Sequence, residues 1–256
     1  MFTKFQPMVR HFKRREKYTF QSLDSTNNFA AKLLSDANPE EGTVILAEFQ
    51  TAGKGQRGKN WEATAGKNLL TSVILRPTFL SVERHALLNK AVALAVFDTV
   101  KEFCETAQVH IKWPNDILVN GLKIAGILIE NVVKFGQIES SIVGVGVNVL
   151  QTSFDEAKAT SLALESNRLI PVEVVCDSLL KNLEKRYSDL QERNFPSLRS
   201  SYREHLFGLG KKKAFVYRNL EVDAIIKGVT PEGKLILEME SGEEVLCSNG
   251  EVVYLS

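Results

Sequence analysis

Residues 109–130 read VHIKWPNDILVNGLKIAGILIE, and this stretch decides the fold. Its β-branched and apolar residues fall into short runs, which predict strands at 109–112, 117–119 and 123–130. Only turn residues separate the runs. Pro114 lies in the first turn, and Asn120-Gly121 forms the second, a strong signal for a two-residue type I′ hairpin. This part of the chain is therefore expected to fold as successive hairpins.

Strands and helices continue on both sides of this stretch. Further strands are predicted at 18–23, 43–50, 68–75 and 138–149. Helices are predicted after an N-cap at Asp24 and Ser25, and then at 81–103, 172–192 and 198–205. Strands joined largely by hairpins, with helices inserted between them, indicate an α+β domain with a mixed β-sheet and flanking helices.

The pattern changes near residue 208. Residues 214–256 hold about five short strands separated by turns, and no helix signal. Such a segment is typical of a small β-barrel of SH3-like size. We therefore expect a larger domain at residues 1–208 and a barrel domain at 209–256.

The composition is that of an ordinary folded protein in a reduced compartment. Lys and Arg number 32 against 31 Asp and Glu, which argues against a protein that coats nucleic acid or anionic membrane. Cys104, Cys176 and Cys247 form no CxxC pair, so neither a disulfide framework nor a metal site is expected. No signal peptide or membrane span is recognisable, which predicts a cytoplasmic location.

Residues 50–61, QTAGKGQRGKNW, combine three glycines with Lys54, Arg57 and Lys59. Exposed backbone amides and cations together suit phosphates, or an anion that develops during a reaction. The spacing also matches a nucleotide P-loop, but Asn60 stands where that motif has Ser or Thr, and no helix follows. The remaining alternative, an exposed loop with solvated charges, is hard to reconcile with Trp61, whose ring suits a flat ligand.

A second polar cluster surrounds Pro114. The turn there makes Lys112, Asn115 and Asp116 project from one strand end, and the Asn120-Gly121 hairpin returns Lys123 beside them. Two interpretations stay open: a cluster arranged around a ligand, or a surface ion pair between Asp116 and a lysine.

Taken together, these segments resemble the biotin–protein ligases, in the form without an N-terminal DNA-binding domain. Four motifs carry the resemblance, in this order: DSTN at 24–27, AEFQTAGKGQRGKNW at 47–61, KWPND at 112–116 with KIAGIL at 123–128, and GVGVN at 144–148. They span about residues 18–150, and the expected terminal barrel also fits the family layout.

The resemblance implies an ATP-dependent, AMP-forming ligase. Biotin and ATP are the substrates, with Mg²⁺ accompanying the nucleotide, and biotinyl-5′-AMP is the intermediate. The acceptor is a lysine of a biotin carboxyl carrier protein. The nearest alternative is a lipoate or octanoate ligase or transferase, but the paired-arginine, triple-glycine stretch of those proteins is absent. A non-catalytic binding protein on the same scaffold is a further alternative.

The same resemblance implies roles for individual residues. Lys123 bridges the biotin carboxylate and the α-phosphate, Asp116 orients the incoming lysine amine, and Arg57 is the third catalytic residue. The residues implied to bind biotin are Ser25, Thr26, Asn27, Gln50, Gly53, Lys54, Gly55, Gln56, Lys123 and Gly126. Those implied to bind ATP are Lys54, Arg57, Lys59, Trp61, Lys112, Asn115 and Asn148, with Trp61 and Asn148 at the adenine.

The chain departs from the family pattern in the glycine and lysine loop. The family usually reads GRGRxG there, and the second of those arginines is Gln56 here. Glutamine brings no charge and no bidentate fork. Either Arg57 or Lys54 compensates, or the adenylate is held more loosely.

The N-terminal residues predict no further partner. Seventeen residues precede the first predicted strand, too few for a DNA-binding domain. The basic run at 10–15 is interpreted as a solvated face, so no DNA binding is expected. Homodimer formation through a sheet edge stays open.

Overall fold

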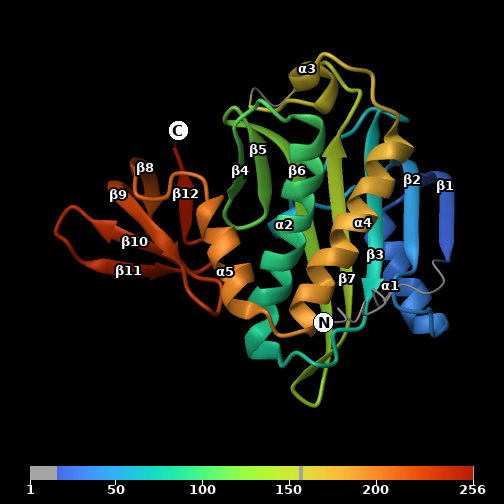
Figure 1. The fold of residues 1–256 in the computed structure, drawn as a ribbon, viewed down its shortest axis with the longest axis horizontal. Coiled ribbons are helices and arrows are strands. Elements are labelled where there is room, and N and C mark those ends of the chain that lie inside the picture. Colours follow the sequence, from blue (N-terminus) through green and yellow to red (C-terminus); the bar gives the residue numbers. More distant parts are fainter. Residues whose placement is uncertain (1–15, 156–157, 256) are drawn as a thin grey trace, which may run out of the picture.

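A seven-stranded mixed sheet forms the frame of the larger part of the molecule (Figure 1). The structure is a computed structural model that describes residues 16–155 and 158–255. The strand order is β1-β2-β3-β7-β6-β5-β4, in which β1 and β2 pair parallel and every other pair is antiparallel. The strands are β1 (Lys17–Leu23), β2 (Val44–Gln50), β3 (Asn68–Leu75), β4 (Val109–Lys112), β5 (Asp116–Val119), β6 (Leu122–Lys134) and β7 (Gln137–Asn148).

Helices cover both faces of this sheet. α1 (Thr26–Asp36) packs on one face, over Ile45, Ile74 and Ile142. α2 (His85–Phe103) and α4 (Val172–Gln191) lie side by side on the other face (Figure 1). All eight residues of β3 are buried, because a central strand covered on both faces has no solvent side. The short α3 (Leu162–Ser166) and α5 (Phe195–Glu204) complete the helices described.

The hairpins predicted between the short strands are present. Asn120 and Gly121 have φ values of 51° and 85°, the positive pair that a type I′ turn requires, and Val119 pairs with Leu122 across them. The turn 113–115 joins β4 to β5, so that Lys112 and Asp116 become cross-strand partners. The predicted strand end is therefore a real meeting point of the polar side chains.

A second, five-stranded antiparallel sheet lies beside α5 (Figure 1). Its order is β11-β10-β9-β8-β12, formed by β8 (Lys212–Tyr217), β9 (Leu220–Val229), β10 (Leu235–Met239), β11 (Glu244–Cys247) and β12 (Val252–Tyr254). The α+β fold with a mixed sheet, flanking helices and a small second sheet is confirmed. The domain division at residue 208 stays a prediction.

Two hydrogen bonds attach the second sheet to the larger part of the molecule. Lys90 Nζ on α2 donates to the Thr230 carbonyl at 2.8 Å, and Trp113 Nε1 donates to the Gly233 carbonyl at 2.9 Å. Burial lowers the pKa of Lys90 to about 8. The turn that follows β9 is thereby attached both to α2 and to the β4–β5 turn.

A few elements differ from the predictions. α2 begins at His85, after a 3-10 turn at Val82–Arg84, and the five residues of α3 were not foreseen. β6 continues to Lys134 because a second hairpin, at Phe135-Gly136 with φ values of 50° and 75°, joins it to β7. Phenylalanine is not a usual turn residue, which is why the sequence concealed this hairpin. The basic run at 10–15 lies outside the described residues.

Two further predictions concern the core and the membrane. The three cysteines are buried and unbonded to one another, as a packing role requires. Across residues 16–155 and 158–255, no helix has the length and apolar character that a membrane crossing demands.

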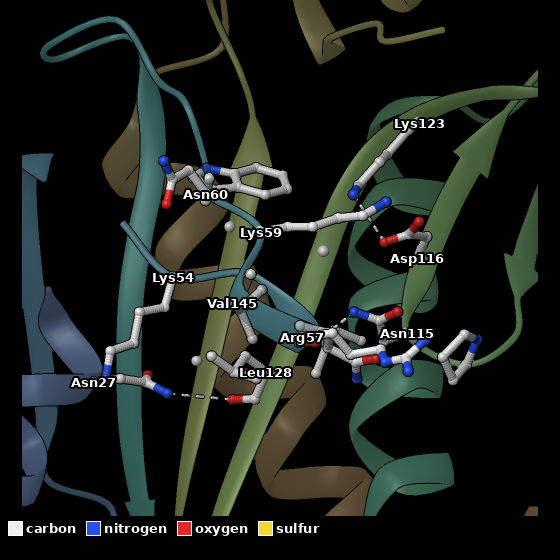
Figure 2. Close-up of a pocket in the computed structure, with 18 of the residues that line it drawn as sticks. Asn27, Lys54, Arg57, Lys59, Asn60, Asn115, Asp116, Lys123, Leu128 and Val145 are labelled. Atoms are coloured by element: carbon white, nitrogen blue, oxygen red, sulfur yellow. Dashed lines mark hydrogen bonds and ion pairs between the residues drawn. The ribbon is translucent and has the colours of Figure 1, made fainter. Parts of the chain in front are cut away.

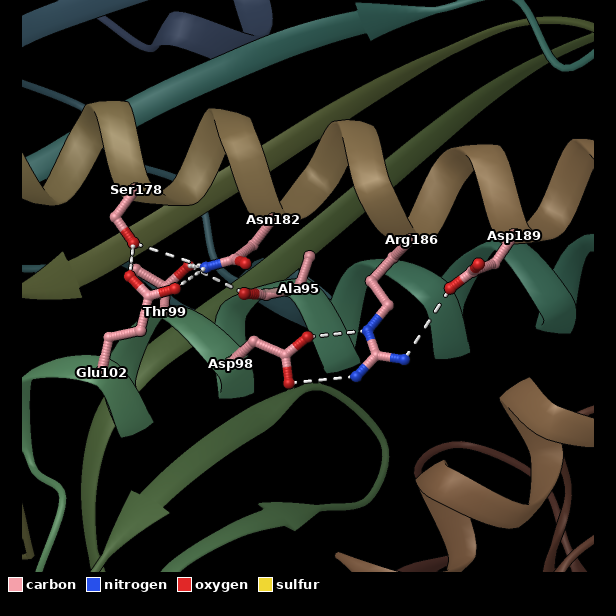
Figure 3. A network of polar contacts seen from close by, with 8 residues as sticks. All are labelled: Ala95, Asp98, Thr99, Glu102, Ser178, Asn182, Arg186 and Asp189. Carbon is pink, nitrogen blue, oxygen red and sulfur yellow. Dashed lines mark hydrogen bonds and ion pairs between the residues drawn. The ribbon is translucent and has the colours of Figure 1, made fainter. Parts of the chain in front are cut away.

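A polar network joins α2 to α4 (Figure 3). Arg186 donates from Nε and Nη2 to the two carboxylate oxygens of Asp98, at 2.7 and 3.0 Å. One turn away, Asn182 Nδ2 lies 3.2 Å from Thr99 Oγ1 and 3.1 Å from Glu102 Oε1. These directional bonds fix the register of two long helices whose apolar faces alone would tolerate sliding.

We expect Asp98→Asn to lower the free energy of unfolding by roughly 1–2 kcal/mol, because it removes the charge that a largely buried guanidinium pairs with. Urea denaturation measures the change. The control is Glu139→Gln, which removes a carboxylate from the exposed Lys134 pair at 3.3 Å and should cost less than about 0.5 kcal/mol. Equal losses in the two variants would contradict the structural role of the Asp98–Arg186 pair.

Candidate active site

A cavity of about 370 Å³ opens over β3, β6 and β7, on the face of the sheet that α1 covers (Figure 2). Its walls come from the start of α1, the loop at 50–61, the turn 113–115 and the β11–β12 turn. The loop folds back on itself, since Gly55 N–H donates to the Lys59 carbonyl at 2.7 Å. Four segments distant in sequence therefore surround one space.

The structure brings together nearly all of the predicted site residues. Those that line the cavity are Ser25, Thr26, Asn27, Gln50, Lys54, Gly55, Gln56, Arg57, Lys59, Trp61, Lys112, Asn115, Asp116, Lys123 and Gly126. Gly53 lies behind the lining, where its carbonyl accepts from Trp61 N–H at 2.9 Å. Asn148 is also outside the lining, because its Nδ2 donates to the buried Thr160 carbonyl at 2.9 Å. Its contact with adenine stays a prediction.

Glycines make the floor of the cavity flat. Gly126 on β6 and Gly146 on β7 are cross-strand partners, and a Cβ on either one would overlap the Trp61 ring. Gly144 makes room for the Asn27 amide in the same way. The absence of side chains here lets an indole ring and an amide lie directly on the backbone of the sheet. This is the physical reason for the GVGVN motif.

Two residues of the cavity lining carry buried donors that have no partner among the described residues. The Trp61 Nε1 and Tyr254 hydroxyl atoms are buried and have no hydrogen-bond partner within the part of the chain that the structure describes. Both residues line the cavity. Burial also raises the pKa of Tyr254, which keeps its proton in place. Buried polar atoms usually find partners, so these two donors point to a ligand.

One carboxylate stands among the cations. Lys123 Nζ lies 3.0 Å from Asp116 Oδ1 and 5.4 Å from the centre of the Trp61 ring. Figure 2 shows Lys59 and Lys123 converging toward Asp116. Asn115 Nδ2 donates to the Ile127 carbonyl at 2.9 Å, which anchors the turn on β6. The sequence left open either a ligand-binding cluster or an ion pair of Asp116 with a lysine. Both hold, because the Lys123–Asp116 ion pair is present and both residues line the cavity.

The sequence did not reveal the contribution of the second sheet. Asn249 Nδ2 donates to Gln56 Oε1 at 2.8 Å, and the Arg57 guanidinium packs directly on Gly250, where a Cβ would overlap it. Lys112 Nζ also lies 4.9 Å from the centre of the Tyr254 ring. No local signal marks Asn249, Gly250 or Tyr254, since only tertiary contact brings them to the cavity.

Comparisons with known proteins agree with this geometry. Residues 19–148 match the biotin/lipoate A/B protein ligase family. The chain belongs to this family. The biotin–[acetyl-CoA-carboxylase] ligase of Mycobacterium tuberculosis is 34% identical over 242 residues, which cover 90% of this chain and 86% of that protein. The bifunctional ligase/repressor BirA of Bacillus spizizenii is 34% identical over 234 residues, which cover 90% of this chain and 71% of that protein.

A solved structure confirms the fold. The biotin protein ligase from Aquifex aeolicus, in complex with biotin and ATP, superposes with a TM-score of 0.78 at 24% identity, covering 94% of this chain and 98% of that one. The resemblance to the biotin–protein ligases that the motifs indicate is confirmed by the identity of 34% to the Mycobacterium tuberculosis ligase.

Within this ligase, the docking of the loop on the second sheet can be tested. We expect Gly250→Ala to speed trypsin cleavage after Lys54, Arg57 and Lys59 roughly tenfold, because the added Cβ displaces Arg57 and releases the loop. Peptide mapping without ligand measures the rates.

The matched control is Gly242→Ala. Gly242 has nearly the same φ, 83° against 87° at Gly250, and an added Cβ there meets no atom within 4 Å. Both variants therefore place alanine at the same strained positive φ, but only Gly250→Ala adds a clash with Arg57. If both variants expose the loop equally, general loosening of the second sheet explains the result and the docking contact does not.

Proposed function

We propose that this protein ligates biotin to a lysine of a biotin carrier protein, using ATP and passing through biotinyl-5′-AMP. The observation that carries the proposal is the meeting, in one cavity, of the cationic glycine loop and the Lys123–Asp116 pair. The identity of 34% to curated biotin–[acetyl-CoA-carboxylase] ligase over nearly the whole chain supports it.

The first half-reaction joins two anions. A carboxylate oxygen of biotin bonds to the α-phosphorus of ATP, the bond from that phosphorus to the β-phosphate oxygen breaks, and pyrophosphate leaves. Five cations line the cavity to offset the repulsion: Lys54, Arg57, Lys59, Lys112 and Lys123. Lys123, extending from the floor strand β6, bridges the carboxylate and the α-phosphate. Mg²⁺ enters as part of the nucleotide substrate.

The second half-reaction needs an uncharged amine. The lysine nitrogen of the carrier attacks the acyl carbon, AMP leaves, and the amine loses a proton. Asp116 is the carboxylate that orients this amine and takes up its proton. Because Asp116 is already paired with Lys123 at 3.0 Å, release of Lys123 to the acyl phosphate frees the carboxylate for the amine.

The buried polar part of the cavity lining favours biotin over lipoate. Ser25, Thr26 and Asn27 are at least nine-tenths buried, and they line the cavity together with Gln50. Thr26 backbone N–H and hydroxyl lie 2.7 and 3.1 Å from Gln50 Oε1. Such a polar lining suits a ureido group, which has both donors and an acceptor, better than a dithiolane or alkyl chain, which offers these side chains no hydrogen bond.

Other assignments are proposals of the same kind. Trp61, Lys112, Asn115 and Asn148 serve the nucleotide, with Trp61 covering the adenine. The partner class, a biotin carrier acceptor, follows from the ligases to which the chain is related. The absence of DNA binding stays a prediction, and homodimer formation stays open.

The test is to incubate the protein with ATP, Mg²⁺ and a carrier domain, offering biotin, lipoate or octanoate in separate tubes, and to weigh the carrier by mass spectrometry. We expect a gain of one biotinyl group only. Lys123→Ala should slow the reaction at least roughly 100-fold, because the charge at the acyl phosphate loses its cation.

The control is Lys134→Ala, which removes a lysine from the exposed far end of the same strand and should leave the rate unchanged. A carrier modified with lipoate or octanoate instead of biotin would overturn the choice of acid. If none of the three acids is attached to the carrier, the protein would be a ligand-binding protein and not a ligase.

A further inference from the structure

The strand that carries Lys123 has a β-bulge directly beside this residue. On β5, Leu118 pairs with Lys123, but the adjacent Ile117 pairs with Ala125, two positions further along β6. Ile124 is therefore an extra residue that β5 does not match. It is fully buried and belongs to the same core cluster as Ala125. A bulge of this kind interrupts the alternation of side chains and can re-aim one of them.

The bulge decides which face of the sheet Lys123 occupies. In a regular strand, residues an odd number of positions apart lie on opposite faces, so the sheet would separate Lys123 from Gly126. A Cβ on Gly126 would instead lie 3.6 Å from Lys123 Cε, and both residues line the cavity. If regular pairing continued from Gly126 to the hairpin turn, Lys123 would point away from the cavity.

A short segment, residues 158–160, holds Lys123 from the side of β7. The pairing between β6 and β7 begins only at Ala125. At Lys123 the short segment takes over, because Lys123 N–H donates to the Lys158 carbonyl and Thr160 N–H donates to the Lys123 carbonyl, both at 2.8 Å. We call this segment the strap. It bonds both main-chain groups of Lys123, so the direction of the Lys123 side chain depends on where the strap lies.

Glu165 on α3 anchors the strap to the β5–β6 hairpin. One of its carboxylate oxygens accepts from Thr160 Oγ1 at 2.6 Å, and the other accepts from Asn120 Nδ2 in the hairpin turn at 2.7 Å. The Thr160 carbonyl also accepts from Asn148 Nδ2 at 2.9 Å. Glu165 is not among the described residues that line the cavity. One carboxylate thus joins the two segments between which Lys123 lies.

We propose that Glu165 is a positioning residue for Lys123. By holding the strap and the hairpin turn together, it keeps the bulge in place and the Lys123 ammonium on the cavity face. This inference rests on the proposed function, in which Lys123 acts at the acyl phosphate. The negative charge of Glu165 is not what the role requires. The role requires a side chain that bonds to Thr160 and Asn120 at once.

The experiment compares two substitutions of Glu165 in the carrier assay with biotin and ATP. Glu165→Ala removes both bonds, and we expect kcat to fall roughly tenfold, because Lys123 is no longer held in its productive position. The KM for ATP should stay within about twofold, since the loss concerns the transition state.

Glu165→Gln should rescue the rate. Its amide oxygen can accept from Asn120, and its amide nitrogen can donate to the Thr160 hydroxyl, which is able to accept, so kcat should stay within about twofold of the wild type. An equal tenfold loss in both variants would show that the charge is what matters, and the inference would be wrong.

Leu164→Ala is the matched control on the same helix. The Leu164 side chain is 45% exposed, and its removal should leave kcat unchanged. An equal loss in this variant would trace the effect to α3 as a whole and not to Glu165. Thermal unfolding checks that each variant is folded.

A double-mutant cycle tests the route of the effect. In a Lys123→Ala background, Glu165→Ala should cause no further loss of the residual rate, because Glu165 acts only through Lys123. Additive losses would show that Glu165 acts by another route, which would overturn the inference.

Hydrogen exchange in the ligand-free protein tests the strap without the reaction. The Lys123 and Thr160 amides should exchange roughly tenfold faster in Glu165→Ala and at the wild-type rate in Glu165→Gln. Unchanged exchange in Glu165→Ala would contradict the anchoring of the strap. A wild-type protein that attaches no acid would defeat the proposed function, whereas exchange would still decide whether Glu165 holds the strap, so the two failures are distinguishable.

Discussion

The architecture depends on two neighbouring strands, β6 and β7, that carry no side chain at the point where a glycine of one pairs with a glycine of the other. Gly126 and Gly146 face each other across β6 and β7, and glycine inside a strand weakens it by removing a packed side chain. The loss is tolerable because β3, fully buried, supports β7 from the far side. An indole ring and an amide can then reach the sheet itself, and the cavity exists because no side chain fills it.

Electrostatics gives this space its chemistry. Among the residues that the structure describes, five cations line it, and Asp116, the single acidic residue of the lining, is held by Lys123. The Lys123–Asp116 pair gives the half-buried lysine a partner before the substrates bind. Once they are bound, Lys123 can move to the acyl phosphate. The Trp61 and Tyr254 donors, which have no partner in residues 16–155 and 158–255, add hydrogen-bonding capacity without charge. The site is therefore arranged for ligands that are anionic at the centre and polar at both ends.

Most of the strands, helices and cavity residues could be predicted from the sequence, for physical reasons that differ from element to element. Asn120-Gly121 predicts its hairpin because both residues tolerate positive φ. Phe135-Gly136 also forms a hairpin turn with positive φ at both residues, but phenylalanine does not predict a turn. Most of the residues that line the cavity could be predicted because they sit in compact motifs. Asn249, Gly250 and Tyr254 could not be, since their place at the cavity follows only from how the second sheet docks.

The bond between Gln56 and Asn249 spans 193 positions of the chain. The ribosome therefore synthesises the glycine loop long before it synthesises Asn249 and Gly250, which the loop contacts in the folded protein. The cavity gains its last wall only when the strand ending at Tyr254 has been synthesised. A nascent chain that already holds the sheet, the helices and all the cations still lacks one side of the pocket, so synthesis itself sets the moment at which the enclosed site first exists.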